Sequence, residues 1–318
     1  MDRTLISFSL FCLSILFPLM ALWAWLRFFT RSRQEEARRK SLGRWMWTAL
    51  VALEVSCVLY GFVEPYRWET TRRTVSIPGL SSPIRVAHLS DLHLHWHNKI
   101  DWEAVLAELE RDKPDLIFLT GDYLDDGTFQ PDLAELLYRL VDIAGQGRVM
   151  AVEGNFEWDG GLAPVFESAN VRLLRDEIVT VSISGQILQV AGVPFPPSPR
   201  FQKLASQIDP QHPAILLHHT PDLAETPGIE AYQLVLCGHT HGGQIRLPFY
   251  GSPYGHSALG RKYQSGLYDL SPKTHLLVNR GLGTEPILGF RLRFLCRPEL
   301  AILDLTKNGP QDDQSNKR

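Results

Sequence analysis

Cysteine is scarce and scattered in this chain. Four of the 318 residues are cysteines, at positions 12, 57, 237 and 296, and no Cys-x-x-Cys pair occurs. This spacing excludes a disulfide framework and a zinc finger. A basic excess is also missing, since 32 lysines and arginines face 35 aspartates and glutamates, a net charge of −3. Nucleic acid is therefore not an expected partner, and nothing in the sequence predicts a protein partner.

The amino-terminal part of the chain, by contrast, is rich in apolar residues. Leu5 to Leu26 has no charged residue over 22 positions, which is long enough to cross a bilayer. No Ala-x-Ala cleavage pattern follows, so a transmembrane segment is expected rather than a removed signal peptide. A second apolar stretch, Trp45 to Val63, is interrupted only by Glu54. This stretch either spans the membrane or lies as a helix in its interface.

Strand and helix patterns alternate after the apolar stretches. The continuous apolar run 116–119 is expected to be a strand buried on both faces. The short β-rich run 84–89 and residues 149–152 are also expected to be strands. A helix begins behind Asp101 and another at Pro131. This alternation predicts an α/β sheet. Further strands are expected at 178–183, 187–193, 214–217, 233–236, 265–270, 275–278 and 300–305.

These patterns also set the expected domain boundaries. Residues 1–63 are predicted to be a membrane anchor, with one apolar helix expected and a second possible around a basic loop. Residues 64–83 are polar and turn-rich, and we interpret them as a linker that includes an edge strand. A folded domain is predicted over 84–306. The polar residues 307–318 are expected to be a disordered tail.

Five short polar motifs stand where hydrophobic runs end. Ligands bind at the carboxyl ends of strands in α/β sheets, so we expect these side chains to converge. The donors in these motifs are two Asp (Asp91 and Asp122), one Asn and four His, which is a ligand set for two adjacent divalent metals with one bridging carboxylate. Any one motif alone is more often a turn or a hydrogen-bonded histidine. The motifs are Asp91-Leu92-His93, Gly121-Asp122, Gly154-Asn155, His219-Thr220-Pro221-Asp222 and Gly238-His239-Thr240-His241.

This set of motifs resembles the calcineurin-like metallophosphoesterase superfamily, whose pattern is D-x-H, G-D, G-N-H-E or G-N-H-D, H and G-H-x-H. The resemblance covers residues 84–305. The run from Gly238 to Gln244 is similar to a bacterial branch of small membrane-linked phosphoesterases, as are 260–263, 266–268 and 279–281. The family implies a four-layer αββα sandwich with two metals at the edge between its sheets. It also implies a metal-dependent hydrolase of phosphoric ester or diphosphate bonds.

The resemblance assigns ligands residue by residue. The first metal would take Asp91, His93, Asp122 and His241, and the second would take Asp122, Asn155, His219 and His239. Among these, Asp122, Asn155 and His219 are expected to be catalytic. His218 is the rival of His219, which is preferred because it directly precedes x-Pro-Asp. Mn²⁺ is the expected metal, with Fe²⁺, Zn²⁺ and Mg²⁺ as alternatives.

Two further features bear on the substrate. Phe156 stands where the family usually has a histidine that assists the leaving group. A phosphate leaving group needs less assistance than an alkoxide, because its second pKa is about 6, so Phe156 favours a phosphoanhydride. Alternatively Phe156 only packs, and His95 or His97 replaces the missing histidine. Arg261 and Lys262, in a loop rich in glycine and proline, either contact phosphate or uridyl groups or form a solvated turn.

The expected substrate is UDP-2,3-diacylglucosamine, split to 2,3-diacylglucosamine 1-phosphate and UMP in lipid A biosynthesis. The alternative is a general bacterial phosphodiesterase or phosphatase. The resemblance places the protein in the bacterial inner membrane, with the bilayer as its partner. Lipid A chemistry predicts a cytoplasmic catalytic domain. Two spans joined by the basic loop, kept cytoplasmic by its charge, would instead place that domain outside.

Overall fold

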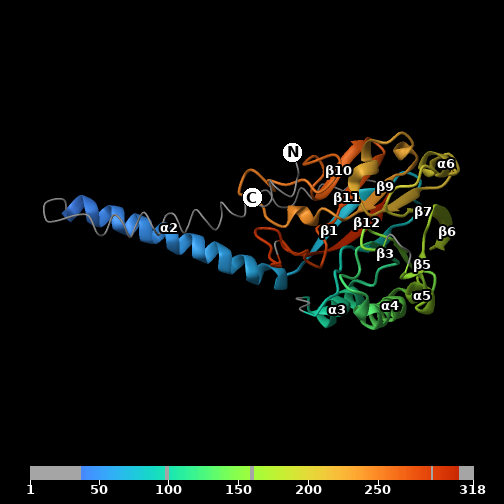
Figure 1. The fold of residues 1–318 in the computed structure, drawn as a ribbon. Helices are drawn as coiled ribbons and strands as arrows, with labels where there is room; N and C mark the ends of the chain where they lie inside the picture. The colour runs from blue at the N-terminus through green and yellow to red at the C-terminus, as the bar shows by residue number, and fades with distance from the viewer. Residues whose placement is uncertain (1–36, 97–99, 158–160, 288, 308–318) are drawn as a thin grey trace, which may run out of the picture. The chain divides into compact units, whose positions relative to one another are not determined.

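The computed structural model describes residues 37–96, 100–157, 161–287 and 289–307. The apolar segment Leu5 to Leu26 and the polar tail lie outside these residues. The second apolar stretch forms the long helix α2 (Ala37–Val63), labelled in Figure 1. Within the described residues, Arg44–Tyr66 is long and apolar enough to cross a membrane. The chain divides into two compact parts, and the larger one, called here the catalytic domain, spans Glu64–Glu285 and Arg293–Arg318.

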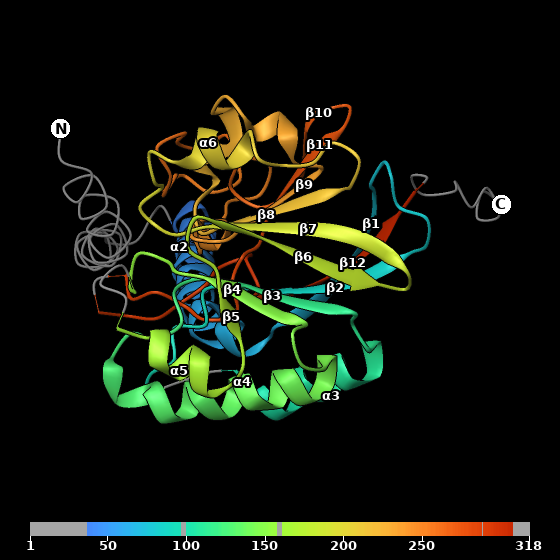
Figure 2. The ribbon, with the colours of Figure 1, turned by 90° about the vertical axis from the view of Figure 1, so that its right-hand side faces the viewer.

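The catalytic domain is built on two six-stranded sheets that face each other (Figure 2). Parallel pairs β2–β3–β4 and β7–β8–β9 form the centre of each sheet. Four of these strands, β3, β4, β8 and β9, are buried along their whole length, which explains their apolar sequences. The first sheet has the order β1 (Glu69–Ser76), β12 (Glu299–Thr306), β2 (Ile84–Leu89), β3 (Leu116–Thr120), β4 (Val149–Val152) and β5 (Arg172–Leu173). The second has the order β10 (Gly266–Ser271), β11 (Thr274–Val278), β9 (Leu234–Cys237), β8 (Ala214–His218), β7 (Gln186–Val193) and β6 (Glu177–Ile183).

Helices cover the outer face of each sheet. Below the first sheet in Figure 2 lie α3 (Trp102–Asp112), α4 (Gln130–Ala144) and α5 (Ala163–Ser168). Above the second lie α6 (Phe201–Ala205) and the 3₁₀ helices η3 (Pro221–Glu225) and η4 (Ile229–Ala231). Three hydrophobic clusters separate these layers, one between the sheets and one under each set of helices. The protein is thus a mixed α/β sandwich, as the sequence predicted.

Local sequence explains the two long helices of the domain. The carboxylate of Asp101 accepts a hydrogen bond from Ala104 N at 3.1 Å and caps α3, while Lys113 ends it in a left-handed conformation. Pro131 occupies the first turn of α4, where its missing N–H costs little, and Gly145 follows the last turn. Both helices turn one apolar face onto the first sheet. The short elements α5, α6 and β5 were not predicted from the sequence, although α5 has a proline in its first turn, as α4 does.

The segment 64–83, expected to be a linker with an edge strand, is an integral part of the catalytic domain. Its strand β1 pairs in parallel with β12 along all eight residues. Ile77 and Leu80 are buried in the cluster between the sheets. The sequence did not predict this role, because the segment is rich in turn residues and few residues of β1 are buried, so no apolar run marks the strand. No separate linker therefore lies between α2, which ends at Val63, and the domain, which begins at Glu64.

Candidate metal centre

The predicted donor residues all lie in loops that leave the carboxyl ends of strands. Asp91 and His93 follow β2, Asp122 follows β3, and Asn155 follows β4. His219 follows β8, while His239 and His241 follow β9. Five of these residues have left-handed backbones: Asp91, His93, Asp122, His239 and His241. Non-glycine residues in this region are strained by about 1–3 kcal/mol each, and such strain collects at functional sites.

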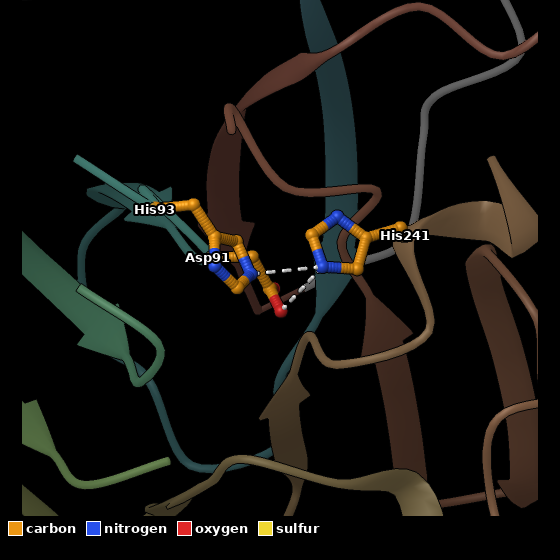
Figure 3. Close-up of side chains that lie close together, drawn as sticks. All are labelled: Asp91, His93 and His241. Carbon is orange, nitrogen blue, oxygen red and sulfur yellow. Dashed lines mark hydrogen bonds and ion pairs between the residues drawn. The ribbon is translucent and has the colours of Figure 1, made fainter. Parts of the chain in front are cut away.

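The first cluster consists of Asp91, His93 and His241, all buried (Figure 3). The Nε2 atoms of His93 and His241 are 3.1 Å apart. His241 Nε2 is 3.4 Å from Asp91 Oδ1. In Figure 3 Asp91 and His93, which belong to one loop, face His241 from another loop, and the three side chains point toward one another. Their donor atoms lie within 4.8 Å of one another, a spacing that a single cation can bridge.

The second cluster consists of Asp122, His219 and His239, and it adjoins the first. His219 Nε2 lies 3.2 Å from Asp122 Oδ2 and 3.1 Å from His239 Nδ1. It also lies 2.9 Å from Asn155 Oδ1. Asp122 Oδ2 is 3.8 Å from His93 Nε2 in the first cluster. The same carboxylate oxygen therefore faces both clusters, as expected of a bridging ligand.

The outer contacts of the histidines indicate what the clusters are built to hold. His219 Nδ1 is 2.6 Å from the carbonyl of Thr120, and His239 Nε2 is 2.8 Å from that of His256. Each contact requires a proton on the outer nitrogen, which leaves the inner nitrogen of the neutral ring with a lone pair. His93 Nδ1 is likewise held by Asp125 Oδ1 at 2.6 Å. The lone pairs of the inner nitrogens and the oxygens of the carboxylates therefore face one another and would repel unless a positive charge lay between them. This donor set fits divalent cations.

The electrostatics of the two clusters agree with a cation site. Burial opposes charge on His219, but Asp122 outweighs this effect and raises the pKa of the imidazole to about 10. Burial likewise opposes charge on Asp122, yet His219 lowers the pKa of that carboxyl to about 2. Burial, reinforced by His219, lowers the pKa of His239 to about 3. The buried carboxylate of Asp122 thus strongly favours positive charge at this position, which is the condition for holding a cation.

Two glycines permit the close approach of the loops. A β-carbon at Gly154 would collide with the carboxylate and backbone of Asp122. One at Gly238 would collide with Ser90 and with the carboxylate of Asp91. The glycines that precede Asn155 and His239 are therefore required by the close packing of these loops.

Glu157 organises the second cluster from behind, and sequence reasoning had assigned it no role. Its buried carboxylate accepts hydrogen bonds from the backbone N–H groups of Asp122 (2.9 Å), Tyr123 (2.7 Å) and Gly154 (3.0 Å). Burial and the neighbouring Asp122 raise its pKa to about 7. One side chain thus joins the loops after β3 and β4. Glu157 occupies the final acidic position of the G-N-H-E pattern, and this position could have indicated its role from the sequence.

Arg293 performs a similar task for the first cluster. It is fully buried, and its guanidinium donates to the carbonyl oxygens of His241, Cys296, Arg280, Gly281 and Gly283. The same segment is tied to the first motif, because Gly283 N donates to Asp91 O at 2.6 Å. Arg293 therefore fixes the loop of His241 relative to that of Asp91. No local sequence pattern marks this role.

The remaining candidates are placed apart from the two clusters. His218 Nδ1 contacts the carbonyl of Val193 at 2.8 Å, so its ring points away from His219. His95 lines a separate pocket formed by residues of α3 and α4, and His97 is outside the described residues. Lys262 pairs with Glu225. Arg261 stacks over the ring of Tyr250 at 4.1 Å.

Phe156 lies beside the clusters but adds no donor side chain. Its backbone N–H donates to Asp122 Oδ1 at 3.1 Å. Its ring meets His93 edge to face, with centroids 4.9 Å apart. The ring is 40% exposed, so it borders the open side of the site. The position of the usual histidine is therefore occupied by an aromatic group that can neither give nor take a proton.

Comparison with known proteins agrees with this geometry. Residues 84–243 match the family model of the calcineurin-like phosphoesterases. The chain is 33% identical to the metallophosphoesterase YkuE of Bacillus subtilis over 77% of this chain and 87% of that protein. It is 28% identical to the phosphodiesterase YaeI of Escherichia coli over 77% and 90%, respectively. Among solved structures, the NAD nucleotidase of Haemophilus influenzae aligns with 15% identity and a TM-score of 0.45, over 64% of this chain and 51% of that one. The chain belongs to the calcineurin-like phosphoesterase family and is a metal-dependent hydrolase.

Proposed function

We propose that this protein is a membrane-anchored phosphodiesterase with a dimetal centre. The observation that carries the proposal is the convergence of seven donors, with Asp122 Oδ2 facing both clusters. The first metal would be held by Asp91, His93, Asp122 and His241, and the second by Asp122, Asn155, His219 and His239. Two such ions, Mn²⁺ by preference, supply Lewis acidity toward a phosphate and lower the pKa of water.

The side chains of this centre suit a diester with a single negative charge. Only two of the seven donors are carboxylates, so a bound phosphate is not strongly repelled. Asn155 turns its amide oxygen toward His219, which leaves its nitrogen as a donor for a phosphate oxygen. The phosphodiesterase name of one relative, YaeI, favours the same bond type.

Phe156 favours a second, narrower candidate. A diester with an alkoxide leaving group gains from a proton donor, and Phe156 offers none. A diphosphate bond releases a phosphate, which needs little protonation at neutral pH because its second pKa is about 6. Hydrolysis of UDP-2,3-diacylglucosamine to 2,3-diacylglucosamine 1-phosphate and UMP fits that requirement and a membrane location.

The apolar helix supports the proposed anchoring. Arg44–Tyr66 meets the length and composition of a membrane span, and it connects directly to the catalytic domain. Residues 1–63 are therefore proposed as the anchor of a bacterial inner-membrane protein. We place the catalytic domain on the cytoplasmic side, where the nucleotide substrate would be available.

One assay separates the two candidates. The full chain, loaded with Mn²⁺ in detergent micelles, is given UDP-2,3-diacylglucosamine and bis-p-nitrophenyl phosphate in parallel. A strong preference in kcat/KM for the nucleotide lipid supports the diphosphatase, and a preference for the chromogenic diester supports the general phosphodiesterase. The matched control is Asp122→Asn, which must abolish both activities. Hydrolysis of neither compound by the metal-loaded protein would refute both candidates.

A further inference from the structure

One exposed apolar cluster of the catalytic domain is not explained by its chemistry. Leu247 (46% exposed), Phe249 (112%), Tyr250 (57%) and Leu295 (45%) all line one open pocket of about 600 Å³. None of the seven donors lines this pocket. Single exposed apolar residues are ordinary, but four around one pocket mark an interaction surface. We call these four residues the apolar rim.

The loop that carries most of the rim is firmly built. Leu247 and Gly251 exchange two backbone hydrogen bonds of 2.9 and 3.0 Å, which close a tight turn over Pro248, Phe249 and Tyr250. Phe249 sits at the tip with a left-handed backbone, φ 63°. A bulky residue in this conformation costs free energy, and no burial of its ring compensates within the domain. The turn therefore presents Phe249 outward.

Two arginines accompany the rim. Arg246 and Arg261 line the same pocket. Arg261 stacks on the ring of Tyr250 and donates to its carbonyl at 2.8 Å. Arg246 donates to the carbonyl of Gly242 and to Ser265 Oγ. In the described part of the chain neither arginine forms an ion pair with a carboxylate, so both charges are available to an external anion.

The rim lies next to the point where the chain enters the catalytic domain. Leu295 belongs to the rim, and the N–H of the adjacent Cys296 donates to Glu64 Oε1 at 3.1 Å. Glu64 is the first residue of the domain, and the candidate span Arg44–Tyr66 includes it. If that helix crosses a membrane, Glu64 lies at or near the membrane surface, because no free linker intervenes. Leu295 is then held close to the same surface by its neighbour.

We propose that the apolar rim is a second membrane contact, with Phe249 and Tyr250 inserted among lipid chains and Arg246 and Arg261 facing anionic headgroups. Aromatic and basic residues are the combination that binds membrane interfaces. A protein partner fits less well. Leu295 of the rim is next to Cys296, which is hydrogen-bonded to Glu64, the first residue of the domain, and lipid headgroups would compete for this position. The contact would fix the orientation of the domain on the membrane, and it does not depend on which phosphodiester is hydrolysed.

The test uses the full chain in lipid nanodiscs of phosphatidylethanolamine and phosphatidylglycerol. Phe249→benzoylphenylalanine places a photoreactive ring at the tip of the turn. Tyr138→benzoylphenylalanine is the matched control, since Tyr138 is 47% exposed on α4, in the helical layer outside the first sheet. After illumination, protein–lipid adducts are measured by mass spectrometry. Both variants are first required to hydrolyse bis-p-nitrophenyl phosphate at the parent rate, which shows that they are folded.

The expected result is a lipid adduct at position 249 in at least about tenfold excess over position 138, the ratio that corresponds to a preference of about 1.4 kcal/mol. The excess should fall when Arg261→Gln is added or when phosphatidylcholine replaces phosphatidylglycerol. Equal yields at the two positions would overturn the proposal. So would cross-linking of position 249 to a second protein chain in place of lipid.

Discussion

Asp122 offers the sharpest test of the metal centre, and Asp122→Asn is the informative substitution. Asparagine keeps the shape of the side chain and an oxygen that can accept the hydrogen bond from Phe156 N. It removes the charge that lies 3.2 Å from His219 Nε2 and 3.8 Å from His93 Nε2. The two clusters then share no carboxylate, and the repulsion between two divalent ions is no longer screened.

The magnitude follows from the effect of Asp122 on His219. Asp122 is the main cause that raises the pKa of His219 from 6.5 to about 10, which corresponds to at most roughly 5 kcal/mol at about 1.4 kcal/mol per pH unit. A cation bound beside His219 would lose the same negative charge, so we expect a loss of binding free energy of the same order. Since about 1.4 kcal/mol is a factor of ten, kcat/KM should fall by about 10³-fold or more.

The assay combines elemental analysis with kinetics on bis-p-nitrophenyl phosphate. Asp125→Asn is the matched control, because Asp125 also contacts His93, at 2.6 Å, but from outside the clusters. Loss of an outer partner typically costs about 10–100-fold in metal affinity or activity. If Asp122→Asn kept two equivalents of metal, or lost no more activity than Asp125→Asn, the bridging role would be refuted.

Four further predictions concern the leaving group, the loops, pH and the basic pair. Phe156→His should raise kcat/KM on alkyl phosphodiesters by about 10²-fold through a regained general acid and change diphosphate hydrolysis little; equal gains on both substrates would contradict the role given to Phe156. Glu157→Gln should lower the free energy of unfolding by about 1–3 kcal/mol, measured in denaturant, because an amide has one acceptor oxygen for three buried N–H groups; an unchanged midpoint would refute this. Burial opposes charge on Glu299, but Arg280 and Arg73 lower its pKa from 4.5 to about 2; the stability it contributes, at most about 3 kcal/mol, should be complete above pH 4.5 and fade as the pH falls toward 2, and this dependence should vanish in Glu299→Gln. Arg261→Ala should leave KM for bis-p-nitrophenyl phosphate and the metal content unchanged, because Arg261 stacks on Tyr250 in a pocket that none of the seven donors lines; a raised KM would show that Arg261 contacts the substrate.

The positions of the donors could be predicted because the rule behind them is local. A strand ends, a polar residue follows, and parallel strands bring their carboxyl ends to one edge. The structure does bring Asp91, His93, Asp122, Asn155, His219, His239 and His241 together. The choice of His219 over His218 came from the resemblance, which puts the ligand directly before x-Pro-Asp. Strand alternation adds only that the two neighbouring rings point to opposite faces.

The residues that support these donors could not be predicted in the same way. Arg293 reaches five carbonyl groups in three segments of the chain, which become neighbours only after folding. The left-handed backbones of Asp91 and His93 likewise follow from the tertiary position of their loop. Strand β1 was read as part of a linker because its partner β12 is more than 200 residues away. A local sequence pattern predicts a single helix or strand, but it does not predict contacts between residues that lie more than 200 positions apart.

The position of β12 has a consequence for biosynthesis. This strand, the last of the described chain, lies between β1 and β2, the first two of the catalytic domain. The first sheet therefore stays open through most of translation, with the edges of β1 and β2 awaiting a partner made more than 200 residues later. The segment of Leu282 and Gly283, which hydrogen-bonds Ser90 and Asp91, precedes β12 by fewer than 20 residues. The loop that carries Ser90 and Asp91 therefore gains these backbone partners, and the first sheet its closing strand, only near the end of translation.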